Sequence, residues 1–283
     1  MIDTDPIVFT AVILASFFHA TWNGMVKKHS NKVTALSAVI LGHVPISIIA
    51  VNFLPMPSFE SLPYIIISAF VHQGYNWFLL TSYSLGDLTK VYPIARGAGP
   101  IVATLISIFF LGLVISKASV ISIGLVCAGI ITIGLFGYKV INNLKIVKYS
   151  LITGVFIGLY SIIDGYGARV SLSAISYLSW VFLLNAILFP ILLKIKKYDN
   201  IFKNVINEGK TIFWIGGSLS YLVYGVVVWG FTKAPIPMVS ALRESSIVFA
   251  IFIGFFFLNE KISLAKIISI SLIFVGVVGL RIY

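Results

Sequence analysis

The chain has 283 residues, of which 59% are hydrophobic and 10% are charged, and its mean hydropathy is +1.05. Soluble domains carry about 25% charged residues, so this composition excludes that class and predicts an integral membrane protein. The formal net charge of +11 does not indicate a nucleic-acid partner, because the basic residues flank apolar runs. Positive-inside topology and anionic lipid headgroups account for basic residues in such places.

Ten apolar runs of membrane-crossing length follow one another along the chain. About 20 residues are needed to cross a hydrocarbon core as a helix, and unpaired backbone groups in lipid exclude open sheets. We therefore predict ten transmembrane helices. They are expected at about Ile7 to Val26, Val33 to Leu54, Leu62 to Leu85, Val91 to Ile115, Ala118 to Tyr138, Leu151 to Ala168, Leu172 to Leu193, Thr211 to Thr232, Ile236 to Leu258 and Leu264 to Leu280.

The segments between these runs leave little room for other folded units. The longest, Lys194 to Lys210, is polar and basic, so we expect no soluble domain. The single cysteine, Cys127, excludes an intramolecular disulfide framework and a thiolate cluster for metal. We expect no metal and no cofactor. We expect no cleavable signal peptide, because the N-terminus carries Asp3 and Asp5 where such a peptide has basic residues.

An internal repeat appears when the chain is slid against itself by 147 positions. Arg96 then falls on Arg243, Ser116 on Ser263 and Gly129 on Gly276. Extending this match predicts a first five-helix unit over residues 1–140 and a second over 141–283. Because five is odd, the second unit enters the membrane from the opposite side. Inverted repeats of this kind surround a midplane site in many secondary transporters, so we expect a central cavity.

Three short motifs carry a family resemblance over nearly the whole chain. They are HATWN at His19 to Asn23, YPIARG at Tyr92 to Gly97, and LNEKIS at Leu258 to Ser263. With the five-plus-five repeat, the sequence resembles an EamA-type member of the drug/metabolite transporter superfamily. The resemblance implies ten helices around a cavity and movement of small metabolites, often outward. The first repeat departs from the family pattern, since LGLVIS at Leu111 to Ser116 has no acidic residue and only Glu260 could take that place.

Two arginines lie inside apolar runs, Arg96 in the fourth span and Arg243 in the ninth. An arginine at the bilayer centre costs about 2.5–3.5 kcal/mol on insertion scales, so it normally faces a cavity or a partner charge. One interpretation is structural pairing with Glu244 or Asp164. The favoured one is a role in substrate binding or gating, because a bidentate guanidinium suits a carboxylate or phosphate.

Other polar and aromatic side chains share helix faces within the spans. His19, Trp22 and Asn23 lie at i, i+3 and i+4, and His72 and Asn76 at i and i+4. Hydrogen-bonding glue or packing is the alternative role for these residues. The substrate-binding candidates are Arg96, Arg243, His19, Trp22, Asn23, His72, Asn76, Tyr92, Tyr221 and Tyr224.

Asp164 and Glu244 are the candidates for charge pairing or proton coupling, since a buried carboxyl can hold an amine or titrate. We therefore expect a secondary transporter, not an enzyme, that moves an amino-acid-like molecule, organic anion or zwitterion by alternating access. Export is the expected direction, with proton coupling or exchange left open. A lipid-linked carrier or flippase is the main alternative. An intramembrane enzyme is disfavoured, because the sequence has no HExxH motif and no phosphate-binding glycine loop. A channel is also disfavoured, because an inverted repeat within one chain is not expected of it.

The expected partners are a small-molecule substrate and the lipid bilayer, with no nucleic acid and with a homodimer left open. The expected location is the inner (cytoplasmic) membrane. Thirteen of the twenty Lys and Arg residues lie in the loops after the odd-numbered spans, and Lys266 lies at the adjoining start of the tenth span. The positive-inside rule therefore puts both termini outside the cytoplasm, whereas the family resemblance implies cytoplasmic termini.

Overall fold

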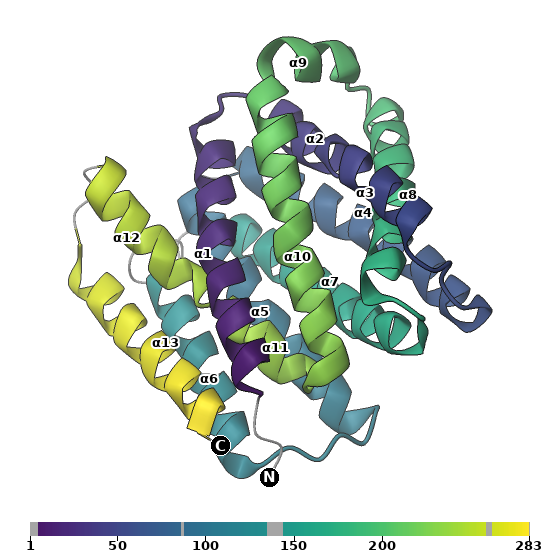
Figure 1. Cartoon of the computed structure of the whole chain (residues 1–283). Coiled ribbons are helices and arrows are strands. Elements are labelled where there is room, and N and C mark those ends of the chain that lie inside the picture. Colours follow the sequence, from purple (N-terminus) through teal and green to yellow (C-terminus); the bar gives the residue numbers. More distant parts are fainter. Residues whose placement is uncertain (1–4, 86–87, 135–143, 259–261, 283) are drawn as a thin grey trace.

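The computed structural model describes residues 5–85, 88–134, 144–258 and 262–282, and in these ranges the chain is helical with no strand. The helices form one bundle, with both ends of the described chain at the same face and α9 at the opposite face (Figure 1). The first half contains α1 (Pro6–Lys28), α2 (Lys32–Gly42), α3 (Val44–Phe53), the 3₁₀ turn η1 (Phe59–Ser61), α4 (Leu62–Leu85), α5 (Leu88–Phe109) and α6 (Lys117–Thr132). The second half contains α7 (Leu144–Val170), α8 (Ala174–Ile195), α9 (Ile201–Glu208), the π-helical turn η4 (Ile212–Gly216), α10 (Gly217–Lys233), α11 (Ile236–Arg243), α12 (Ser246–Leu258) and α13 (Leu264–Ile282).

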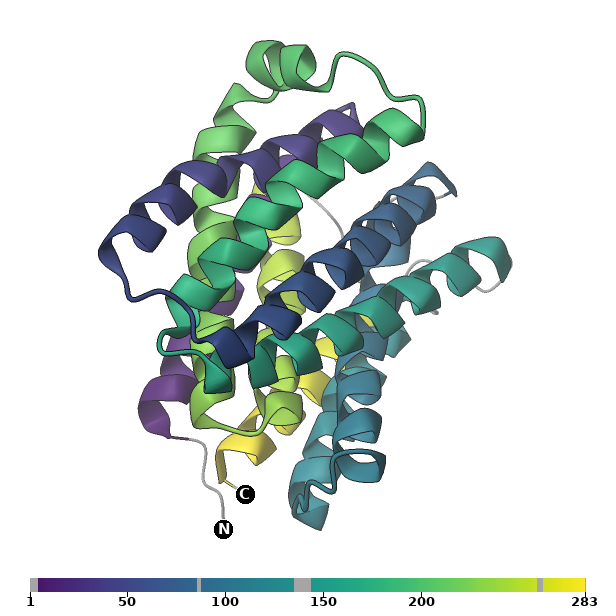
Figure 2. The same ribbon diagram turned by 90° about the vertical axis from the view of Figure 1, so that its right-hand side faces the viewer.

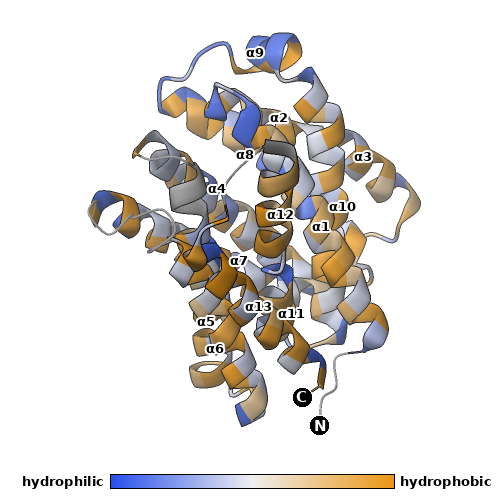
Figure 3. Ribbon diagram, turned by 90° about the vertical axis from the view of Figure 1, so that its left-hand side faces the viewer, coloured by the Kyte–Doolittle hydropathy of each residue, from blue (hydrophilic) through white to orange (hydrophobic). Residues whose placement is uncertain are grey.

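Length and hydropathy make this a multi-pass membrane protein. Within the described residues, seven helical stretches are long and apolar enough to cross a bilayer, and two shorter apolar helices lie at 93–109 and 117–132. Large apolar side chains such as Phe53, Phe110 and Val114 are more than 80% exposed, as lipid-facing residues are. Figure 3 shows apolar residues along most helices and polar ones gathered on α9.

Local sequence signals explain where several helices begin. The Asp5 side chain accepts from Ile7 N, with Pro6 in the first turn of α1. Asn31, Ser116 and Ser173 cap α2, α6 and α8 in the same way. Such caps satisfy amide groups that have no partner within the helix.

Two predicted spans form membrane-length stretches as expected, at Lys32–Phe53 and Ile236–Phe256, but each is interrupted once. The second span divides at His43 into α2 and α3, because Pro45 lacks an N–H and its ring crowds the preceding turn. The ninth span divides into α11 and α12 at Glu244 and Ser245, where tighter hydrogen bonds run from Glu244 N to Ala241 O and from Ser245 N to Leu242 O. The predicted loop Lys194 to Lys210 contains helix α9.

The crossing of α6 with α13 is reciprocal at the offset of 147 positions. A Cβ added at Gly129 would lie 2.8 Å from Ser269 O, and one added at Gly276 would lie 2.6 Å from Ser122 O. Gly129 and Ser122 fall on Gly276 and Ser269 under that offset. Each helix therefore meets the other's backbone through the equivalent glycine. Figure 1 shows the two helices side by side at the edge of the bundle.

Helices α4, α7, α8 and α10 surround the bundle centre together with α1, α5 and α11. The first and second halves interleave here, since α4 packs on α7 and α8, and α1 packs on α10 and α12. Figure 2 shows α2, α4, α7 and α8 running obliquely beside one another. Polar side chains from both halves are thereby brought to one place.

Candidate functional site

Arg96, Arg243 and Glu244 form a buried charged cluster, here called the arginine centre, where α5 packs against α11. Arg96 Nε lies 2.7 Å from Glu244 Oε2, and Arg243 Nε lies 3.5 Å from Glu244 Oε1. The three residues are at most 4% exposed. The break between α11 and α12 follows Arg243 directly. With all three groups ionised, the arginine centre carries one net positive charge.

The guanidinium of Arg243 is incompletely hydrogen-bonded. Its Nε and Nη2 atoms, and Oε1 of Glu244, meet no hydrogen-bond partner within the described residues. Its main chain is held, because Ser16 Oγ on α1 donates to Arg243 O at 3.1 Å. Buried polar groups are nearly always hydrogen-bonded. The unpaired N–H groups of Arg243 are therefore an exception, and they are available to an acceptor supplied by a ligand.

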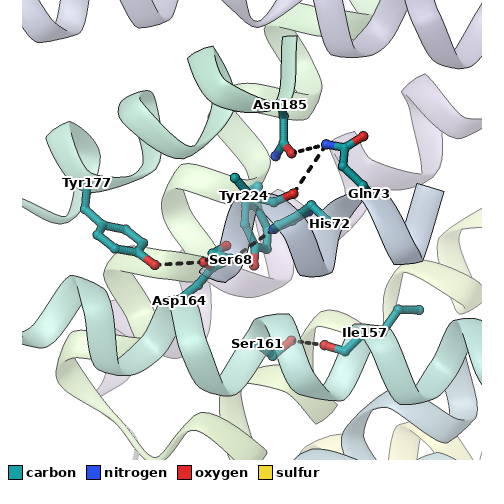
Figure 4. Close-up of polar contacts among 10 residues, drawn as sticks. Ser68, His72, Gln73, Ile157, Ser161, Asp164, Tyr177, Asn185 and Tyr224 are labelled. Atoms are coloured by element: carbon teal, nitrogen blue, oxygen red, sulfur yellow. Dashed lines mark hydrogen bonds and ion pairs between the residues drawn. The ribbon is translucent and has the colours of Figure 1, made fainter. Parts of the chain in front are cut away.

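Asp164 on α7 anchors a second cluster, here called the aspartate centre (Figure 4). Its carboxylate accepts from Ser68 Oγ, from Tyr177 OH at 3.0 Å, from Tyr224 OH at 2.6 Å, and from the Nε2-protonated form of His72 at 3.1 Å. These donors come from α4, α8 and α10. Asp164 is fully buried and therefore joins four helices through a single carboxylate.

A cavity of about 90 Å³ lies between the two centres. A single water needs about 10–15 Å³ measured in this way, so the space suits a small metabolite or several waters. Charged, amide and aromatic groups line it, with Asn185 held by Gln73 Nε2 at 2.6 Å. The lining residues are His19, Trp22, Leu36, Val39, Ile40, His43, His72, Tyr75, Asn76, Arg96, Tyr160, Phe182, Asn185, Ser220, Val223, Tyr224 and Arg243.

Seven of the residues expected from the sequence meet at this cavity: Arg96, Arg243, His19, Trp22, His72, Asn76 and Tyr224. Two others make contacts elsewhere. Asn23 Nδ2 donates to His19 O of its own helix, and Tyr221 OH lies 2.6 Å from Ser179 Oγ. Tyr92 belongs to α5, but its side chain lies outside the described residues, as does Glu260. Asp164 and Glu244 lie directly behind the wall, bonded to residues that line it.

Several lining residues were not among those predicted from the sequence, chiefly Phe182, Asn185 and Ser220. Asn185 carried a signal, since an amide inside the otherwise apolar run Leu172 to Leu193 is costly in lipid unless it is paired. Phe182 carried none, because an aromatic residue in such a run equally suits lipid or packing.

One end of the cavity is closed by tight packing near the chain termini. Arg169 at the end of α7 donates from Nε to Phe231 O at 2.8 Å and from Nη2 to Ala234 O at 3.0 Å. These carbonyls belong to the end of α10, whose negative dipole favours a cation. Val12, Phe231 and Ile236 are at most 3% exposed around this junction. The ends of α7 and α10 are therefore locked together.

The opposite end is held less firmly. Helices α1 and α4 occupy places in the first half that match α7 and α10 in the second, yet the described residues give no comparable packing between them. Cavity residues come from the later turns of α1 and α4 and the early turns of α10. That end also carries the Lys27, Lys28 and Lys32 cluster. The cavity thus lies toward the lysine-rich face.

The described residues bring together no group of three His, Cys, Asp or Glu side chains able to hold a metal ion. The arrangement instead offers two buried charge centres facing one another across a small polar and aromatic space. Such a cavity can bind an anionic group at the arginine centre while amides and tyrosine hydroxyls contact the remainder of the ligand.

Comparisons with known proteins agree with this architecture. Residues 144–282 match the model of the EamA-like transporter family. An uncharacterized membrane protein of Bacillus subtilis, YvaE, is 34% identical over 105 residues, which span 37% of this chain and 85% of YvaE. One protein of known crystal structure superposes with a TM-score of 0.72 at 14% identity, over 96% of this chain and 94% of that one, so the likeness concerns the fold alone.

Proposed function

Because this chain belongs to the EamA-like transporter family and is a membrane transporter, we propose that it carries a small anionic or zwitterionic metabolite by alternating access. The observation that carries the proposal is the cavity between the arginine and aspartate centres. It contains a buried, incompletely partnered guanidinium, aromatic surfaces and two amides, which suit a carboxylate-bearing molecule of amino-acid size.

We further propose that ten spans form two inverted five-helix units around this cavity, with residues 1–140 and 141–283 as the two units. The reciprocal contact of Gly129 and Gly276 supports the repeat, because it relates the halves by a two-fold axis at the offset seen in the sequence. In this arrangement α2 with α3, and α11 with α12, each count as one interrupted span. Interrupted helices are typical of transporter binding sites.

The difference between the two ends of the cavity supports alternating access. Arg169 joins the ends of α7 and α10, whereas no comparable packing joins their counterparts α1 and α4 within the described residues. In an inverted repeat, the second conformation follows when the halves exchange these roles. Export from the cytoplasm fits a cavity that lies toward the lysine-rich face, because the positive-inside rule assigns that face to the cytoplasm. We propose the inner membrane as its location.

Thiol labelling tests the access mechanism, since the chain has one cysteine, Cys127, and it is buried. In a Cys127→Ala background, Asn185→Cys probes the cavity and Phe231→Cys probes the closed end. An impermeant maleimide should label Asn185→Cys from the lysine-rich face alone. Arg169→Gln should then raise labelling of Phe231→Cys from the other face by about tenfold, since two charge-assisted bonds are lost.

Lys233→Gln is the matched control, because Lys233 is an exposed cation beside the same junction. Simultaneous labelling of both cysteines from both faces would contradict alternating access and favour a channel. Uptake of labelled carboxylates and amino acids into proteoliposomes, with and without a pH gradient or internal solute, tests the substrate class and separates proton coupling from exchange. Arg243→Gln should abolish that uptake. Transport of neutral lipids alone would favour a flippase.

A further inference from the structure

The two halves of the arginine centre differ at one position. Under the offset of 147, Arg96 corresponds to Arg243, but Gly97 corresponds to Glu244. The arginine is thus duplicated while the carboxylate is present in the second half alone. Two buried arginines therefore share one buried carboxylate. In a symmetric site, each half would be expected to carry both an arginine and a carboxylate.

The geometry shows how this carboxylate is shared. Glu244 gives one oxygen to Arg96 at 2.7 Å and leaves the other 3.5 Å from Arg243. Arg96 therefore forms the closer ion pair with Glu244, whereas Arg243 lies farther from the carboxylate and its Nε and Nη2 atoms meet no hydrogen-bond acceptor in the described residues. Arg243 is 2% exposed and lines the cavity.

A purely structural pair would not leave this imbalance. A buried charge without a full partner is strongly destabilising, so a second carboxylate or a neutral residue at position 243 would serve packing better. Glu244 lies within ion-pair distance of both guanidinium groups but closely contacts only Arg96, so Arg243 retains donors that a second carboxylate could engage. One further carboxylate, supplied by a ligand, would bring the arginine centre to zero net charge.

We infer, resting on the proposed transport function, that Glu244 is a built-in counter-ion that sets the arginine centre to one net positive charge. It thereby selects ligands that present a single carboxylate and rejects those that present two negative charges. Among the described residues that line the cavity, Arg96 and Arg243 are the only arginines and there is no lysine. The second anionic group of a dicarboxylate therefore meets the buried, negatively charged Glu244 and Asp164 without a further cation of this kind to neutralise it. Glu244 is thus a specificity-determining residue that need not touch the ligand.

Binding of pentanoate and glutarate to the purified full chain tests the inference, because both probes have five carbons but carry one and two carboxylates. Dissociation constants come from calorimetry or ligand-induced thermal shifts. The unmodified protein should bind pentanoate at least about tenfold more tightly than glutarate. In Glu244→Gln that preference should fall by about tenfold or reverse, because one buried charge changes a nearby interaction by at least this factor.

The double variant Arg96→Gln/Glu244→Gln removes both members of the close pair and returns the arginine centre to one positive charge. It should restore the preference for pentanoate to within about threefold of the unmodified protein, and it serves where Glu244→Gln alone does not fold. Glu208→Gln, the same change on the exposed helix α9, should leave the preference unaltered.

An unchanged preference in Glu244→Gln, or a double variant that resembles Glu244→Gln, would overturn the inference. Binding of glutarate as tight as that of pentanoate to the unmodified protein, or binding of neither, would also overturn it. The proposed function has its own test in the proteoliposomes. Uptake of a dicarboxylate that depends on Arg243 would preserve the transporter and reject the counter-ion role of Glu244.

Discussion

The aspartate centre and the arginine centre are both fully buried and both charged, yet they are completed to different degrees. Asp164 receives four hydrogen bonds from three other helices. Arg243 has one loose ion pair at 3.5 Å and unused donors within the described residues. A completed buried charge organises a fold, whereas an incomplete one that faces a cavity is suited to an outside partner. From this contrast we expect the aspartate centre to hold the fold together and the arginine centre to bind the ligand.

Removing the carboxylate of Asp164 should have the largest effect on stability. Asp164→Ala leaves four donors without their acceptor, and loss of one partner from such a buried network costs about 3–5 kcal/mol of unfolding free energy. Unfolding of detergent-solubilised protein by heat or denaturant measures it. Ser161→Ala, three residues earlier on the same helix, is the control, because Ser161 Oγ bonds Ile157 O within α7 (Figure 4). Equal stability of the two variants would contradict the scaffold role.

Two tyrosines that bond to the same carboxylate allow a structural role and a ligand-binding role to be tested separately. Tyr177 OH and Tyr224 OH each donate to Asp164, but Tyr224 alone lines the cavity. Each change to Phe should cost about 1 kcal/mol of unfolding free energy, the net worth of one hydrogen bond. Only Tyr224→Phe should weaken substrate binding, by a few-fold, as measured by the KM of uptake. A similar loss of binding in Tyr177→Phe would show that the hydrogen bonds that stabilise Asp164 cannot be separated from ligand binding.

Arg243→Gln should have the smallest effect on stability. The substitution removes an incompletely partnered buried cation and leaves the close pair of Arg96 and Glu244 intact, so the unfolding free energy should stay within about 1 kcal/mol of its original value. The stabilisation that pentanoate gives to the unmodified protein should nevertheless disappear. Thermal unfolding with and without pentanoate measures both quantities. A loss comparable to that of Asp164→Ala would make Arg243 a scaffold residue.

The class of the protein and much of its helical organisation could be predicted from the sequence. Apolar runs of membrane length predicted the helices, and HATWN, YPIARG and LNEKIS predicted the family, which the comparisons confirm. The interruption of the second span at His43 could be predicted, because Pro45 lies two residues later. The break after Arg243 had no such signal, because Pro237 lies at the start of α11 and the interruption occurs within Arg243-Glu244-Ser245.

The candidate site could be predicted in part. Charged residues within apolar runs identified Arg96, Arg243, Asp164 and Glu244, since lipid makes such residues costly. The close contact of Arg96 with Glu244 was one of the pairings that the sequence offered. The four donors to Asp164 were not predictable, because their contacts depend on how α4, α7, α8 and α10 pack. Helical spacing alone put Glu244 about 100° from Arg243, whereas the interrupted helix leaves it in contact with both arginines.

The glycines at the crossing of α6 and α13 also constrain how this carrier can move. At Gly129 and Gly276 the two backbones approach so closely that a methyl group would meet a carbonyl oxygen and a β-branched side chain on the partner helix. Packed surfaces with no free space resist sliding. In the proposed alternating-access cycle we therefore expect this crossing to stay fixed as a pivot while the distances at the cavity change.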